Sequence, residues 1–153
     1  MGRPGDDRGV TGLPFFVYGT LRPGLTNHDA FLQGRTAAEE PARLPGARLY
    51  DGPGYPYLRL GGTGEVRGEL VYPAPGRYGE LLAALDGLEE YLGPRHPRNL
   101  YEREACEAVR LRDGGTVRAW VYVAAERVPL GPPVPDGDWL SHRRRTPDGP
   151  RTP

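Results

Sequence analysis

The chain has 153 residues, with 20 acidic and 20 basic side chains that cancel to no net charge at neutral pH. This balance gives no electrostatic reason to expect nucleic acid or an anionic membrane surface as a partner. Every basic side chain other than histidine is arginine, so Schiff-base chemistry on lysine and a Walker-type phosphate loop are both excluded.

The composition also bounds the kind of fold. This length suits one domain with a real core, and the 23 glycines and 18 prolines favour many turns and short strands over a helical bundle. The single cysteine, Cys106, excludes an intramolecular disulfide, and no cysteine or histidine pair has the spacing of a metal site. No segment reads as a membrane span or a secretory signal. We therefore expect a cytoplasmic protein without a bound metal.

The first predicted strand covers about residues 13–19. Its run of Leu, Phe, Val and Tyr favours a strand, and Gly19 together with Pro23-Gly24 favours a turn directly after it. The main-chain N–H groups of Gly19, Thr20 and Leu21 are in a position to converge on an anion or a carbonyl oxygen. An ordinary strand-to-loop exit, in which the glycine only permits the turn, explains the same composition.

A short helix and an irregular segment are expected next. Asn27 is a suitable cap and Gly34 a suitable stop, so the sequence predicts a short helix over 27–33. From 35 to 49, two prolines, Pro41 and Pro45, favour an irregular or edge strand. Its candidate inward residues are Ala42, Leu44, Ala47 and Leu49.

Four more strands are predicted from alternating and β-branched patterns. The first two cover about 55–60 and 65–72, and the run of Gly and Thr at 61–64 predicts a hairpin turn between them. The last two cover about 100–111 and 116–124. With the helix described below, these strands predict an α+β fold whose small mixed sheet is curled or barrel-like, with one main helix and one short helix.

The main helix is predicted between Tyr78 and Leu92, where the hydrophobic period changes to that of a helix. Gly93-Pro94 is the predicted stop. Six apolar side chains share one face of the helical wheel. They are Tyr78, Leu81, Leu82, Leu85, Leu88 and Leu92.

One carboxylate, Glu89, falls on this apolar face, about 20° around the wheel from Tyr78, whereas Glu90 points about 100° further, toward the polar side. A carboxylate on a buried face is costly unless it is paired, hydrogen-bonded or protonated. Burial also raises its pKa toward the range of a general acid or base. Two other interpretations stay open: the helix ends near Leu88 and Glu89 reaches solvent, or Glu89 pairs with an arginine such as Arg103.

Seven segments match a known family pattern in the same order. They are Y-G-T-L-R-P-G at 18–24 with Asn27-His28, Y-P-Y-L at 55–58, G-E-L at 68–70, L-D-G-L-E at 85–89, Y-E-R at 101–103, A-W-V-Y at 119–122 and G-D-W at 137–139. Together they resemble the gamma-glutamyl cyclotransferase-like family over about residues 15–140. The closest resemblance is to the branch that acts on gamma-glutamylamines.

The resemblance implies residue roles. Glu89 corresponds to the catalytic glutamate of the family, and Tyr18 with the main chain at Gly19, Thr20 and Leu21 corresponds to the substrate-binding loop. Tyr101 and Arg103 are weaker candidates. The chain departs from the family at Glu90, where a glycine is usual, and in the proline- and arginine-rich loop that follows the main helix.

The resemblance also implies an activity that needs no cofactor. A gamma-glutamyl cyclotransferase of the lyase or acyltransferase type releases 5-oxoproline and a free amine from a small gamma-glutamyl amine or amide, because the substrate's α-amine attacks its own γ-carbonyl. Glu89 is then the general acid and base. Two alternatives stay open: a non-catalytic binding module of the same fold, and a biosynthetic enzyme that removes a gamma-glutamyl protecting group from a specialised metabolite.

The expected domain organisation is simple. Residues 1–12 are rich in glycine and charge, so we expect a disordered lead-in. One domain is expected over 13–140, followed by a flexible polar tail at 141–153.

Overall fold

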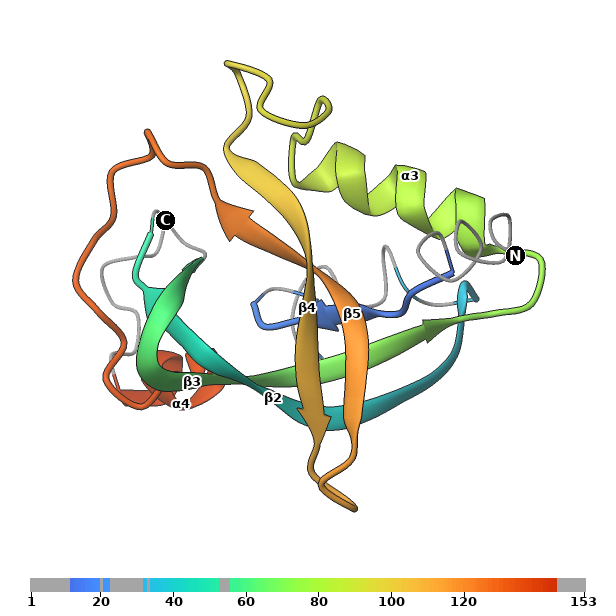
Figure 1. Cartoon of the computed structure of the whole chain (residues 1–153), viewed down its shortest axis with the longest axis horizontal. Helices are drawn as coiled ribbons and strands as arrows, with labels where there is room; N and C mark the ends of the chain where they lie inside the picture. Colours follow the sequence, from blue (N-terminus) through green and yellow to red (C-terminus); the bar gives the residue numbers. More distant parts are fainter. Residues whose placement is uncertain (1–11, 20, 23–31, 33, 53–55, 146–153) are drawn as a thin grey trace.

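The computed structural model describes residues 12–19, 21–22, 32, 34–52 and 56–145. Five strands form a closed barrel, and α3 lies along one side of it (Figure 1). The predicted α+β class with a barrel-like mixed sheet is therefore confirmed. The elements in chain order are β1 (Phe15–Val17), β2 (Thr36–Tyr50), β3 (Tyr57–Pro73), α3 (Tyr78–Leu88), β4 (Tyr101–Arg110), β5 (Thr116–Ala124) and α4 (Trp139–Arg145).

The barrel order is β1-β3-β2-β4-β5, and it closes between β5 and β1. All neighbouring strands are antiparallel except this last pair, where Phe15 lies parallel and opposite to Trp120. Because β1 sits between β3 and β5, both of its edges are paired. The turn that follows β1 is therefore held at a fixed place relative to the rest of the barrel.

Both faces of β1 are buried, which explains why it reads as an unbroken apolar run. Phe16 and Tyr18 join the core cluster that contains side chains from all five strands, whereas Phe15 and Val17 join a second cluster with α3. The strand is shorter than the expected 13–19, because only three residues keep the hydrogen-bonded pairing with the neighbouring strands.

Residues 36–50 form a regular strand rather than the irregular segment that was one of the two predictions, and the strand has one largely open edge, as the other prediction held. The prolines lie within one continuous strand, β2, that pairs along its length with β3. Its other edge pairs with β4 only through Ala42 and Arg43, so a missing proline N–H costs little there. Pro45 also adjoins a register shift. The predicted inward residues are all buried: Ala42, Leu44, Ala47 and Leu49.

The prediction of a hairpin turn at 61–64 is wrong, because β3 runs without a break from Tyr57 to Pro73. Pro45 pairs with Glu65 and Ala47 pairs with Leu60, so four residues of β3 bulge opposite a single residue of β2. Gly61 and Gly62 have φ of 119° and 82°, which only glycine adopts readily. The glycines of this run accommodate a bulge within one strand.

Helix α3 ends at Leu88, four residues earlier than predicted. The chain turns at Glu90, whose φ is 57°, and two bonds close the end: Glu90 N–H donates to Gly87 O at 3.2 Å and Tyr91 N–H donates to Asp86 O at 2.9 Å. This is a Schellman motif. Leu92, predicted to lie on the buried face, is 57% exposed because it follows the turn.

Helix α4 continues five residues past residue 140, where the domain was expected to end. Three predicted segments lie mostly outside the described residues: the lead-in up to residue 11, the tail from 146, and the short helix at 27–33. Of that short helix only Leu32 is described, and it is buried. These boundaries stay predictions. No helix in the described part of the chain is long and apolar enough to cross a membrane.

We predict that Gly68→Ala weakens the fold by about 2–4 kcal/mol. Gly68 lies on buried β3, where an added Cβ would overlap the carbonyl oxygen of Val17 and meet the Phe16 ring at 2.9 Å. Gly87→Ala is the matched control: no heavy atom lies within 4 Å of its added Cβ, and alanine favours a helix by up to about 1 kcal/mol. Urea unfolding would measure both, and equal stabilities would contradict the packing described for β1.

Candidate active site

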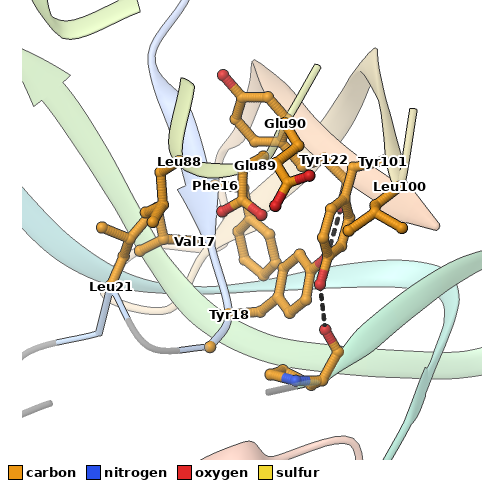
Figure 2. Close-up of a pocket in the computed structure, with 12 residues that line it drawn as sticks. Phe16, Val17, Tyr18, Leu21, Leu88, Glu89, Glu90, Leu100, Tyr101 and Tyr122 are labelled. Atoms are coloured by element: carbon orange, nitrogen blue, oxygen red, sulfur yellow. Dashed lines mark hydrogen bonds between the residues drawn. The ribbon is translucent and has the colours of Figure 1, made fainter. Parts of the chain in front are cut away.

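A cavity of about 170 Å³ opens where β1, α3, β4 and β5 meet. Its walls come from β1 and the following turn (16–19 and 21), the end of α3 (88–90), the start of β4 (100–101), and the single residues Pro56 and Tyr122. Figure 2 shows the Glu89 and Glu90 carboxylates above the aromatic rings of the cavity. Segments far apart in the sequence therefore share one small pocket.

Most of the sequence-predicted site residues come together here. Tyr18, Gly19, Leu21 and Glu89 all line the cavity, while Thr20 lies outside the described residues. Of the weaker candidates, Tyr101 lines the cavity; Arg103 does not.

Glu89 occupies the cap position at the end of α3, and its main-chain N–H donates to Leu85 O at 2.9 Å. The side chain is partly buried, and among the described residues its carboxyl has no hydrogen bond or ion pair. Burial raises the pKa of Glu89 from 4.5 to about 7. The helix thus ends near Leu88, as one open interpretation held, yet Glu89 faces the cavity and is shielded from bulk water.

Arg103 does not pair with Glu89, because another carboxylate holds it. Asp86, one turn earlier on α3, accepts a bond from Arg103 Nη1 at 2.5 Å and another from the Tyr122 hydroxyl at 2.5 Å. The guanidinium also lies over two aromatic rings, at 4.9 and 4.8 Å from their centroids. These contacts tie the last turn of α3 to β4 and β5, and so fix where Glu89 points.

The tyrosine hydroxyls around the cavity are engaged in bonds to the protein. Tyr18 donates to Tyr122 O at 2.5 Å, and Tyr101 donates to Pro56 O at 2.8 Å. Burial raises the pKa of Tyr18 well above its ordinary value, and burial together with the bond to Asp86 raises that of Tyr122. These rings act as neutral walls, whereas the Glu89 carboxyl, with a pKa of about 7, can exchange a proton near neutral pH.

A buried arginine anchors the turn after β1. Arg22 is 8% exposed; its Nε lies 2.8 Å from a Glu69 oxygen and its Nη1 lies 2.9 Å from an Asp138 oxygen. Its main-chain N–H donates to Gly19 O at 3.0 Å, which closes the turn. The turn is thereby fastened to β3 and to the start of α4. Sequence reasoning missed this anchor, because its partners lie 47 and 116 residues away.

Glu90 lines the cavity, although the helical wheel placed it on the polar side. The helical wheel does not apply to Glu90, because α3 ends at Leu88 and Glu89 is its cap residue. None of residues 93–99 lines the cavity; several of them line a separate, open hollow. Fully buried Asn99 holds this loop, accepting from Leu92 N–H at 2.7 Å and donating to Gly93 O at 2.8 Å.

No group of three or more His, Cys, Asp or Glu side chains among the described residues is arranged to hold a metal ion. Cys106 is partly buried on β4, away from the cavity, and burial raises the pKa of its thiol to about 11. A thiol of that pKa is a weak nucleophile at neutral pH.

Comparison with known proteins gives a consistent result. A family model described as gamma-glutamyl cyclotransferase, AIG2-like, matches residues 15–141. The gamma-L-glutamyl-butirosin B gamma-glutamyl cyclotransferase of Niallia circulans is 39% identical over 108 residues, which cover 71% of this chain and 64% of that protein. The match thus spans slightly less than two thirds of that relative.

Two further matches cover a larger share of the matched protein. A Vibrio cholerae protein with the provisional name gamma-glutamylcyclotransferase is 36% identical over 124 residues, covering 81% of this chain and 92% of that protein. The crystal structure of a mouse AIG2-like protein superposes with a TM-score of 0.59 at 25% identity, covering 76% of this chain and 80% of the mouse chain.

We predict that Arg22→Met destabilises the protein by about 2–4 kcal/mol, because it leaves two partly buried carboxylates without their cation. Arg118→Met is the control: its ion pair with Glu107 is exposed and 3.6 Å long, so the expected loss is below about 1 kcal/mol. Denaturant unfolding of both variants would check this. A loss at Arg22 no greater than at Arg118 would contradict the anchoring role.

We predict that Glu89→Gln stabilises the protein at high pH. The folded pKa, about 7, exceeds the ordinary 4.5, so the folded state binds more protons between these values and wild-type stability falls as pH rises through that window. Glutamine carries no such penalty. The variant should match the wild type below pH 4.5 and exceed it by up to about 3 kcal/mol at pH 8. Unfolding curves at both pH values would measure the difference, and a pH-independent difference would refute it.

Proposed function

The chain belongs to the gamma-glutamyl cyclotransferase, AIG2-like, family, and we propose that it releases 5-oxoproline and a free amine from a gamma-glutamyl amine or amide. The observation that carries this proposal is the Glu89 carboxyl, which lines a small cavity without a partner among the described residues and has a pKa of about 7. Such a group can take and return a proton at neutral pH.

The reaction begins with the substrate's α-amine, which attacks its own γ-carbonyl once it has lost a proton. Glu89 in its ionised form accepts that proton. The attack closes a five-membered ring within one molecule, so a pocket that holds the substrate folded supplies much of the acceleration. Phe16, Tyr18 and Tyr101 line the same cavity as Glu89, and its volume of about 170 Å³ would enclose a folded gamma-glutamyl group.

The attack produces a tetrahedral oxyanion. The main-chain N–H groups of the turn at Gly19, Thr20 and Leu21 would hold this oxygen or the substrate's α-carboxylate. Protonated Glu89 then gives its proton to the departing nitrogen, and the C–N bond to the leaving amine breaks, while the ring nitrogen loses its second proton to water and becomes an amide N–H. One C–N bond forms and another breaks, the freed amine takes up a second proton from water to become an ammonium, and no oxidation occurs.

A second candidate function uses the same chemistry on a different substrate. The enzyme would remove a gamma-glutamyl protecting group from a specialised metabolite that carries an amine. The relative from Niallia circulans, named for gamma-L-glutamyl-butirosin B, favours this possibility. The two candidates differ only in the leaving amine, so they share one proposed site.

We predict that Glu89→Gln lowers the rate of 5-oxoproline release by a factor of about 10² to 10⁴. In the wild type, kcat/KM should rise as pH increases through about 7, because the ionised carboxylate starts the reaction. Release from a panel of gamma-glutamyl amines, gamma-glutamyl amino acids and glutathione would be measured side by side.

Glu107→Gln, an exposed change on β4 outside the cavity, is the control and should keep full activity. A folded Glu89→Gln protein with full activity would remove Glu89 from the mechanism. If the wild type released no 5-oxoproline from any substrate, a non-catalytic binding module would be the better description.

A further inference from the structure

Glu90 holds an unusual conformation at the edge of the cavity. It is the left-handed residue of the turn that ends α3, with φ of 57°. Glycine adopts this conformation freely, whereas a residue with a Cβ is strained in it. The two hydrogen bonds that end the helix come from the main chain of Glu90 and Tyr91, so they do not need a carboxylate at this position.

The turn brings the Glu90 side chain to the cavity that Glu89 lines. Both carboxylates line the cavity (Figure 2), and because Glu89 is partly buried whereas Glu90 is exposed, Glu90 lies toward the mouth. Within the described part of the chain, the Glu90 carboxylate has no hydrogen bond or ion pair. A carboxylate at the mouth of a pocket, without a partner in the protein, is available to a ligand.

The described lining of this cavity contains two carboxylates and no Arg, Lys or His side chain. The Arg103 guanidinium on β4 is bound to Asp86 and lines the other hollow. The remaining walls are apolar or carry tyrosine hydroxyls that already donate to the protein. The described walls therefore supply negative charge at the mouth and nothing to balance it.

The substrate's orientation follows from the proposed function. The gamma-glutamyl group must reach both Glu89 and the turn after β1, so it occupies the inner part of the cavity. The leaving group is the part that varies and departs, so it faces the mouth and Glu90. A gamma-glutamyl group carries one α-ammonium and one α-carboxylate, which cancel, so the charge of the leaving group decides whether the mouth attracts or repels the substrate.

We propose that Glu90 selects gamma-glutamyl substrates whose leaving amine carries a second, positively charged amine, and that it disfavours leaving groups with a carboxylate. This inference rests on the proposed function, because it assigns the leaving group to the mouth of the same site. It assigns to Glu90 a selectivity for the charge of the leaving group, with a cationic tail favoured over a neutral one and a neutral tail favoured over an anionic one.

Three substrates of matched length separate charge from shape: the gamma-glutamyl amides of diaminopentane, pentylamine and aminopentanoate, which carry a cationic, a neutral and an anionic tail. We expect wild-type kcat/KM for 5-oxoproline release to favour the cationic over the neutral tail about threefold to fivefold. The anionic tail should be disfavoured by a similar factor. Because the contact is exposed, raising the salt concentration to about 0.5 M should bring the ratios toward one.

Two variants test whether Glu90 is the cause. Glu90→Gln removes the charge and keeps the shape, and Glu90→Gly removes the charge and also relieves the left-handed strain. Both should bring the cationic-to-anionic ratio close to one, whereas only Glu90→Gly should raise the stability. Glu107→Gln removes the same charge on β4 outside the cavity and should leave all ratios as in the wild type.

The outcomes separate this inference from the proposed function. If the wild type releases 5-oxoproline from the three amides at equal rates, or if Glu90→Gln keeps the wild-type preference, the role of Glu90 is refuted and the reaction stands. If the wild type releases none from any amide, the proposed function fails and the selectivity assigned to Glu90 falls with it.

Discussion

The burial of one carboxyl, Glu89, is the constraint on which the rest of the site depends. A carboxyl that is shielded from bulk water and has no partner among the described residues is costly, and its burial raises its pKa to about 7. Its placement needs a helix that ends at the cavity wall, and the left-handed turn at Glu90 provides that end. The fold thus holds a destabilising group at the position where, in the proposed reaction, a proton is exchanged.

Two arginines with long-range partners hold the two halves of the cavity. Arg22 fastens the turn after β1 to β3 and α4, and Arg103 fastens the end of α3 to the β4–β5 hairpin through Asp86. Each guanidinium is partly or fully buried, so each ion pair is also a geometric constraint. Because β1 is paired on both edges, the two halves keep a fixed separation. A site held in this way needs little reorganisation when charge develops in the reaction.

The two carboxylates that line the cavity lie in different environments. Glu89 lies inside, where burial brings its pKa to about 7, and Glu90 lies at the mouth, exposed to solvent. Neighbours in sequence thus meet different environments, because the chain changes direction between them. In the proposed reaction this difference would let Glu89 exchange a proton while Glu90 acts on the charge of the leaving group.

The sequence by itself determined the features that local patterns encode: the apolar strand before the turn, the apolar face of the helix that precedes Glu89, and the burial of Ala42, Leu44, Ala47 and Leu49 on β2. It also determined the class of fold, since hydrophobic period and turn chemistry act over a few residues. The tertiary structure decided the continuity of β2 and β3, the partners of Arg22 and Arg103, and the direction of Glu90. The strands continue because an open strand edge tolerates proline, the arginines are paired with residues far apart in the chain, and Glu90 turns because a left-handed residue ends the helix. No local sequence pattern contains any of these three features.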